Sequence, residues 1–178
     1  MVVPMIGKSE SNIPLNGPLP WTHGCLVCGE HNPRGFRLRT RLENGSVVLD
    51  YVTQRQDAGY THLVHGGVAM TLMDEVMTWA AIVTVGQMCV AAEMTTRLVL
   101  PITVGAKLRV EARVTRNARR LILTEARVLD EGGAVLSEAT GKYVPVAAEK
   151  TALHDKDFIH GPETIPITHI LRAGKPGA

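Results

Sequence analysis

The stretch Val64-His65-Gly66-Gly67-Val68-Ala69-Met70-Thr71-Leu72-Met73-Asp74-Glu75 decides the fold of this chain. Its glycine pair precedes a segment that stays almost entirely apolar to Val85, with apolar residues recurring every three or four positions. This period predicts a helix over roughly 67–85, and its apolar character on nearly all sides predicts that the helix is buried. Two adjacent carboxylates stand in its middle, where burial is costly unless each has a partner.

Alternating apolar and polar residues predict strands on both sides of this helix. Before it, residues 36–42 alternate, and Asn44-Gly45 is a hairpin-turn signal that leads into a partner strand at 47–52. After Gly86 the two-residue period continues through further segments at 88–100, 106–116, 120–129 and 134–146. The links between them are too short for parallel crossovers. The sequence therefore predicts an α+β fold, in which an antiparallel sheet of five or six strands curls around one long buried helix.

The chain is expected to form one domain with two extensions. Residues 1–20 are rich in proline, show no periodicity and are interpreted as an N-terminal arm. Residues 21–146 form the folded domain, and residues 147–178 are expected to be an irregular C-terminal tail.

Composition argues against several classes of function. The 19 basic and 17 acidic side chains nearly balance, and aromatic residues make up only 4% of the 178, so nucleic-acid binding is not predicted. The uncharged run between Glu75 and Glu93 contains polar residues and falls short of the ~20 apolar residues of a membrane span. No secretory signal precedes the three cysteines, so a cytoplasmic protein is expected.

The helix start and the helix acid are the two parts of a predicted active site. Backbone N–H groups at Gly66 and Gly67 would point outward at the positive end of the helix and could hold a developing oxyanion. Two glycines can also simply make a tight corner before a helix. Asp74 shares one stripe of the helix with Thr71 and Thr78, so it has hydroxyl neighbours, although a structural pairing with an arginine of the sheet is the alternative.

The spacing of these two parts predicts a dimer. Gly66 and Asp74 are separated by roughly 12 Å along a helix axis, whereas groups acting on one carbonyl must approach it to about 3 Å. A two-fold dimer with antiparallel helices would bring Asp74 of one chain to Gly66 of the other. A composite site at a dimer interface is therefore expected.

Several motifs of this chain resemble those of the hotdog-fold acyl-CoA thioesterases. His65-Gly66-Gly67 is followed by an acid nine residues after the histidine. Supporting motifs are Cys25-x-x-Cys28-Gly29 with Asn32-Pro33-x-Gly35-Phe36, Thr95-Thr96-Arg97-Leu98 ahead of Pro101, and Gly141. Within the family, the chain is most similar to the phenylacetate-degradation and 4-hydroxybenzoyl-CoA thioesterases, over about residues 21–146.

The resemblance implies a hotdog fold and hydrolysis of an acyl-CoA or aroyl-CoA thioester. Asp74 would be the nucleophile or general base, the Gly66 N–H would polarise the thioester carbonyl, and Thr78 would orient the acid or water. His65 would shape the start of the helix. The chain departs from its relatives at Asp57-Ala58-Gly59, where they often carry Gln or Asn. No cofactor is expected beyond the CoA of the substrate, and the assembly is expected to be a homodimer or a dimer of dimers.

Substrate contacts are predicted at two further places. Arg116, Arg119 and Arg120 cluster at a predicted turn and could meet the phosphates of CoA, although a solvated basic turn is the alternative. Met70 and Met77, together with Met73 and Trp79, could line an apolar acyl pocket.

A metal site is considered at the start of the domain. His23, Cys25, Cys28 and His31 are four potential zinc ligands within nine residues. Zinc sites usually draw ligand pairs from separated segments, so no metal is predicted and these residues are only candidates.

Three other functions fit the sequence less well. A hotdog enoyl-CoA hydratase would use an Asp and a His, and Asp57-x4-His62 has that spacing but lacks the Asn-Pro expected between them. A non-catalytic acyl-CoA-binding protein would leave Asp74 without a purpose, as would a plain structural dimer.

Overall fold

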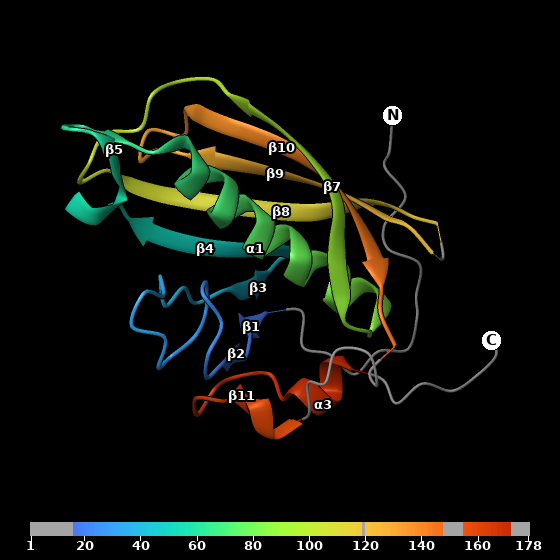
Figure 1. Cartoon of the computed structure of the whole chain (residues 1–178). Helices are drawn as coiled ribbons and strands as arrows, with labels where there is room; N and C mark the ends of the chain where they lie inside the picture. The colour runs from blue at the N-terminus through green and yellow to red at the C-terminus, as the bar shows by residue number, and fades with distance from the viewer. Residues whose placement is uncertain (1–15, 119, 148–154, 172–178) are drawn as a thin grey trace.

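One long helix, α1 (Gly66–Val85), lies against the concave face of an antiparallel sheet (Figure 1). The computed structural model describes residues 16–118, 120–147 and 155–171. The helix ends at Gly86, which adopts a left-handed conformation (φ 67°) and donates its N–H to Ile82 O. The predicted α+β architecture, with a single buried helix and an antiparallel sheet, is confirmed.

The main sheet has seven strands in the order β1-β3-β4-β8-β9-β10-β7. Their bounds are β1 (Gly17–Pro18), β3 (Arg41–Glu43), β4 (Ser46–Val52), β8 (Lys107–Asn117), β9 (Ile122–Leu129), β10 (Val135–Pro145) and β7 (Cys89–Leu98). The chain enters β7 directly from the helix, yet β7 lies beyond β10 at one edge of the sheet. The predicted Asn44-Gly45 turn joins β3 to β4, and both of its residues have positive φ.

Smaller elements surround this sheet. They are β2 (Trp21–Thr22), η1 (Arg55–Asp57), β5 (Ala58–Tyr60), β6 (Leu63–Val64), η2 (Asp155–Asp157), β11 (Phe158–Ile159) and α3 (Ile167–Ile170). The β5–β6 hairpin leads into the start of α1, and β11 pairs with β2.

The core lies between α1 and the concave face of the sheet. Leu72, Met73, Val76 and Met77 of the helix are fully buried there, against inward residues of the strands such as Val110. By length and composition alone α1 would suffice to cross a membrane, but half of its apolar window is buried inside the protein. Burial against the sheet is thus sufficient to explain why the helix is apolar on most sides.

The strand predicted at 36–42 is only partly present, since strand structure begins at Arg41. Arg37 has a positive φ of 54°, which interrupts the extended backbone. The backbone N–H groups of Phe36 and Leu38 instead donate to Leu26 and Val27, each at 3.0 Å. The alternation predicted burial correctly, because Leu38 and Thr40 are buried even though they are in no strand.

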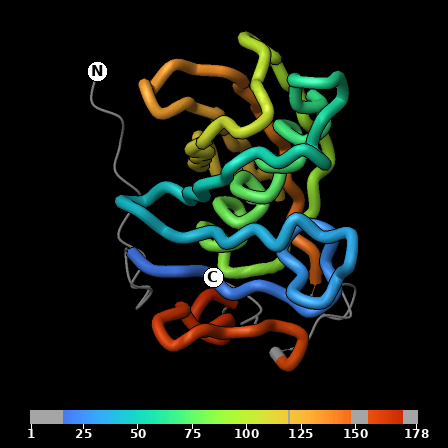
Figure 2. Tube along the Cα trace, turned by 90° about the vertical axis from the view of Figure 1, so that its left-hand side faces the viewer, coloured from blue at the N-terminus to red at the C-terminus, as the bar shows by residue number. Residues whose placement is uncertain are grey.

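The tail prediction is wrong for residues 155–171. These residues form η2, β11 and α3 and lie against the lower end of the domain (Figures 1 and 2). Phe158, Ile167 and Ile170 are buried and join the main hydrophobic core. Residues 148–154 and 172–178 of the predicted tail, and 1–15 of the predicted arm, lie outside the described residues.

Candidate active site

The start of α1 holds one free backbone donor. His65 is the N-cap residue, and its Nδ1 accepts a hydrogen bond from the Gly67 N–H at 2.9 Å. The Val68 N–H donates to His65 O at 2.9 Å. Within the described part of the chain, the Gly66 N–H has no hydrogen-bond partner. Of the two glycines predicted to form an oxyanion hole, Gly66 is therefore the one with an available N–H.

Gly66 lies against the end of the edge strand. A Cβ added there would stand 2.7 Å from Leu98 Cδ1. The start of the helix therefore lies beside the Leu98 side chain, at the end of the edge strand β7.

Asp74 is held by a residue that the sequence analysis missed. Its Oδ1 accepts a hydrogen bond of 2.7 Å from the Tyr143 hydroxyl on β10. Thr78 also lies near the Tyr143 hydroxyl and acts to lower its pKa, while the Thr71 hydroxyl donates to Gly67 O at 2.9 Å. Asp74 is partly exposed, and among the described residues its other oxygen, Oδ2, accepts no hydrogen bond. The carboxylate is therefore fixed at one oxygen and open at the other.

Gly141 makes room for the Tyr143 ring. A Cβ on Gly141 would lie 2.6 Å from Tyr143 Cε2 and 2.8 Å from Thr124 Oγ1. β10 keeps an unbroken register with β9 from Ser137 through Tyr143, so the ring lies on the same buried face of the strand as Gly141, two residues earlier. Burial, followed by the hydrogen bond to Asp74, raises the pKa of Tyr143 above that of a free phenol, so its hydroxyl stays protonated and acts as a donor.

Glu75, unlike the partly exposed Asp74, lies in a buried environment. Its carboxylate accepts a hydrogen bond of 3.1 Å from Trp79 Nε1. Burial is the main reason that its pKa rises to about 7. The two adjacent acids of α1 thus have different surroundings, and only Asp74 is accessible to a substrate.

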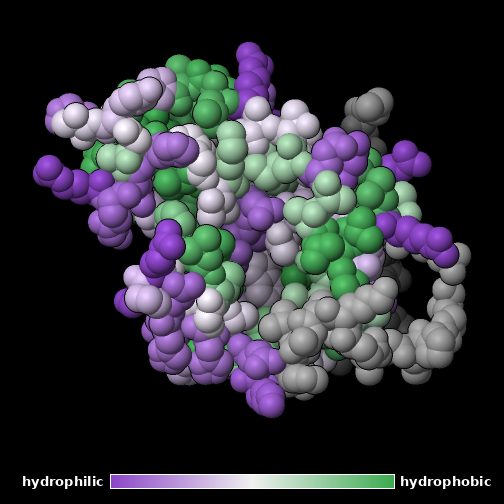
Figure 3. Space-filling view, in the orientation of Figure 1, coloured by the Kyte–Doolittle hydropathy of each residue, from purple (hydrophilic) through white to green (hydrophobic). Residues whose placement is uncertain are grey.

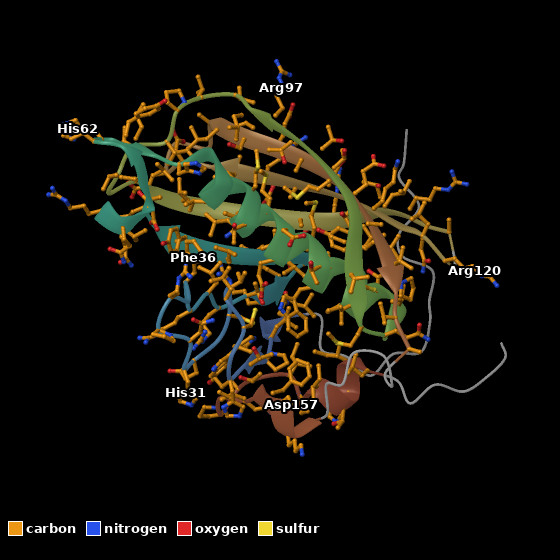
Figure 4. The ribbon with its side chains drawn as sticks, in the orientation of Figure 1. His31, Phe36, His62, Arg97, Arg120 and Asp157 are labelled. Atoms are coloured by element: carbon orange, nitrogen blue, oxygen red, sulfur yellow. The ribbon has the colours of Figure 1, made fainter. Side chains whose placement is uncertain are left out.

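The residues predicted to contact the substrate differ in how exposed they are. Met70 is 38% exposed, but Met77 is fully buried in the core, so the structure gives it no contact with an open pocket. Arg116 and Arg120 are exposed where β8 turns into β9, and Arg119 lies outside the described residues. Figure 4 shows Arg120 at the opposite end of the sheet from His62, which precedes the helix.

The other candidate residues have structural partners. Asp57 is buried and accepts hydrogen bonds from the Tyr51 hydroxyl and the Gln54 N–H, both at 2.7 Å, whereas His62 is exposed. The His23 and His31 rings stack at 5.5 Å. In the ranges that the structure describes, no three His, Cys, Asp or Glu side chains are grouped as metal ligands.

The β7 edge of the sheet is apolar and unpaired in one protomer. β7 has a partner strand on only one side, β10. Val90, Leu98, Val99 and Leu100, on β7 and just after it, are 40–51% exposed. Figure 3 shows hydrophobic atoms gathered over the end of β7 and the loop that follows. An exposed apolar edge of this kind is typical of a strand that another chain covers.

Comparison with known proteins agrees with this arrangement. Residues 61–137 match the family model of the thioesterase superfamily. This part of the chain is therefore similar to the thioesterase superfamily. The matched region includes the Gly66 turn, Asp74 and all of α1, but ends before Tyr143.

Solved structures show the same hotdog fold. Escherichia coli PaaI, from the phenylacetic acid degradation operon, is 19% identical over 58% of this chain and 74% of PaaI, with a TM-score of 0.55. A protein described as a thioesterase superfamily protein is 25% identical over 69% of this chain and 60% of its own, with a TM-score of 0.62. A Streptococcus mutans protein bound to acetyl-CoA is 18% identical over 58% of this chain and 82% of its own, with a TM-score of 0.55. No curated protein matches the sequence.

Proposed function

We propose that this protein hydrolyses an acyl-CoA or aroyl-CoA thioester to the free acid and CoA, with Asp74 as the acid that attacks or activates water. The observation that carries the proposal is the carboxylate of Asp74, held at Oδ1 by Tyr143 and open at Oδ2. The match of residues 61–137 to the thioesterase superfamily supports the reaction class, and the acetyl-CoA bound to the similar Streptococcus mutans protein supports a CoA ester as substrate.

The active unit is a homodimer in this proposal. Gly66 and Asp74 are separated by roughly 12 Å along α1, so one chain cannot bring both to the same carbonyl. The free Gly66 N–H lies beside the unpaired β7 edge, where a second copy of the chain would cover the exposed apolar residues. Pairing across this edge would place each Gly66 near the Asp74 of the other protomer.

The reaction follows from these positions. Asp74 Oδ2 takes a proton from water, the water oxygen attacks the thioester carbonyl carbon, and the Gly66 N–H of the other protomer stabilises the oxyanion. Collapse of the intermediate breaks the carbon–sulfur bond, and the CoA thiolate takes up a proton. Direct attack by Oδ2 on the carbonyl, followed by hydrolysis of the resulting anhydride, is the second route that this geometry supports.

Tyr143 is a positioning residue in either route. Its hydroxyl holds Oδ1 and thereby fixes the direction of Oδ2. Thr78, one helical turn from Asp74 and near the Tyr143 hydroxyl, is a candidate to orient the attacking water. The exposed arginines Arg116 and Arg120 remain candidates for the CoA phosphates, and Met70 for the acyl chain. We propose no cofactor and a cytoplasmic location.

Thiol release from a panel of acyl- and aroyl-CoAs tests the function. Wild-type protein is expected to release CoA from at least one class, and Asp74→Asn is expected to lose about a hundredfold or more in kcat while still binding the substrate. Saturable binding without turnover of any panel member would contradict hydrolysis and favour an acyl-CoA-binding protein instead.

A further inference from the structure

Cys25 and Cys28 form a paired thiol group beside the buried acid of α1. The Gly29 N–H donates to Cys25 O at 3.0 Å, which closes one helical turn from 25 to 29 and places the two thiols on the same side of it. A Cβ on Gly29 would collide with the Cys25 carbonyl oxygen, so the turn depends on glycine. Thioester hydrolysis as proposed above uses neither cysteine.

The two sulfurs have unequal surroundings. Cys25 is half-buried, and its Sγ accepts a hydrogen bond of 3.3 Å from the Val27 N–H. Cys28 is buried, with 6% of its surface exposed. The interaction between the two thiols is the main reason that the pKa of Cys25 is lowered and that of Cys28 raised. An accessible thiolate beside a buried thiol is the arrangement of a nucleophilic and a resolving cysteine.

Glu75 supplies a proton acceptor for the buried thiol. Its buried carboxylate accepts a hydrogen bond of 3.1 Å from Trp79 Nε1, and the neighbouring Cys28 thiol favours its ionised form and so lowers its pKa. A buried carboxylate with a pKa near 7 can take a proton at neutral pH, because its two forms are then comparable in free energy. Glu75 has no part in the proposed hydrolysis, and Cys28 is the group from which it could take a proton.

From this juxtaposition of Cys25, Cys28 and Glu75 we infer that the protein carries a redox-active dithiol that exchanges with low-molecular-weight disulfides such as oxidised glutathione. The Cys25 thiolate attacks one sulfur of the disulfide, forming a mixed disulfide and releasing one thiolate, which is protonated by water. Cys28 then gives its proton to Glu75, and its sulfur attacks Cys25 Sγ. The mixed disulfide breaks, a second thiol is released, and the protein holds a Cys25–Cys28 disulfide. In total the protein loses two hydrogens and one disulfide molecule becomes two thiols.

Intact-protein mass spectrometry in oxidised glutathione tests the exchange. The mass of the wild-type protein is expected to fall by two hydrogens. Peptide mapping is expected to assign the new disulfide bond to Cys25 and Cys28. The Cys89→Ser variant is the matched control, because the third cysteine is buried elsewhere, and it is expected to behave like wild type. Wild-type protein that keeps both thiols reduced, or that forms a bond to Cys89, would overturn the inference.

Single-cysteine variants test the order of attack. Cys28→Ser lacks the resolving sulfur but keeps a donor beside Cys25, so it is expected to accumulate the glutathione adduct at Cys25. Cys25→Ser is expected to form an adduct at Cys28 at least about tenfold more slowly. Equal rates would contradict the assignment of Cys25 as nucleophile. Circular dichroism of each reduced variant establishes that the fold is kept, and Cys28→Ala replaces Cys28→Ser if the serine variant is unfolded.

The role of Glu75 is tested separately. Glu75→Gln keeps an oxygen for Trp79 Nε1 but accepts no proton, so the second step is expected to slow at least about tenfold and the mixed disulfide to become detectable. First-step kinetics, measured in the Cys28→Ser background with and without Glu75→Gln, should change much less. A second step as fast as in wild type would overturn the role given to Glu75.

Discussion

At the scale of single residues, Asp74 and Glu75 have different surroundings because neighbouring positions of a helix face different directions. Asp74 meets a buried tyrosine hydroxyl and a partly open surface, whereas Glu75 is enclosed near Trp79 and Cys28. The sequence predicted Asp74 as the functional acid because a carboxylate in an apolar helix needs a reason. It did not predict Tyr143, because a contact across 69 residues leaves no local pattern.

Replacing Tyr143 by phenylalanine is expected to lower kcat about ten- to a hundredfold with little change in KM. The ring still fills its site, but Asp74 Oδ1 loses its hydrogen bond of 2.7 Å and the carboxylate is no longer held in one direction. Steady-state thiol release measures both constants. A rise in KM with kcat unchanged would contradict a positioning role.

The stability of the protein is expected to depend on pH through Glu75. Its pKa is about 7 in the folded state and near 4.5 when unfolded, so the folded state binds more protons between these values and becomes less stable as pH rises through that window. The loss should total about 3 kcal/mol. Urea unfolding of wild type and Glu75→Gln at about pH 5 and about pH 8 measures it. A similar loss in both proteins would contradict the assignment to Glu75.

At the scale of elements, β10 determines where Tyr143 points. Its regular register with β9 keeps Tyr143 on the buried face of the sheet, and its glycine at 141 leaves room for the ring to reach Asp74. Gly141→Ala is expected to destabilise the fold by about 1–3 kcal/mol, because the added Cβ would lie 2.6 Å from the ring. Gly24→Ala, where a Cβ meets nothing within 4 Å, is the control. Equal urea midpoints for the two variants would contradict the steric account.

Edge strand β7 is the element on which assembly depends in this account. Val90→Lys places a charge on the exposed apolar edge and is expected to shift the protein to monomers and to abolish hydrolysis. Val52→Lys is the matched control, since Val52 on β4 is 53% exposed and Val90 is 50% exposed. Sedimentation velocity measures the shift. Two variants that sediment alike would contradict assembly through β7.

The elements themselves were largely predictable, and the exceptions have physical reasons. Two-residue periodicity predicted β4 and β7 to β10 and the Asn44-Gly45 turn, because each strand has one buried and one exposed face. At 36–40 the same alternation reports burial without strand pairing, since Arg37 turns the backbone away. Residues 155–171 show no comparable period, and their place in the core depends on contacts distant in sequence, such as that between Phe158 and Trp79.

At the scale of the whole molecule, the separation of Gly66 from Asp74 leaves one protomer incomplete as a catalyst in the proposed mechanism. This separation follows from the spacing of the two residues in the sequence, and the second chain that it calls for remains a prediction. The edge that would receive this chain was not, because the place of β7 beyond β10 follows from the strand order of the folded sheet.

Subunit complementation tests the central claim, a site shared between two protomers, most directly. Gly66→Pro removes the free N–H at a helix position where proline is well tolerated, and Gly66→Ala keeps the N–H as its control. Asp74→Asn and Gly66→Pro are each expected to be inactive alone. After co-expression, half of the dimers are mixed and each has one intact site, so thiol release should return to about a quarter of the wild-type rate. No recovery, with mixed dimers present, would contradict the composite site.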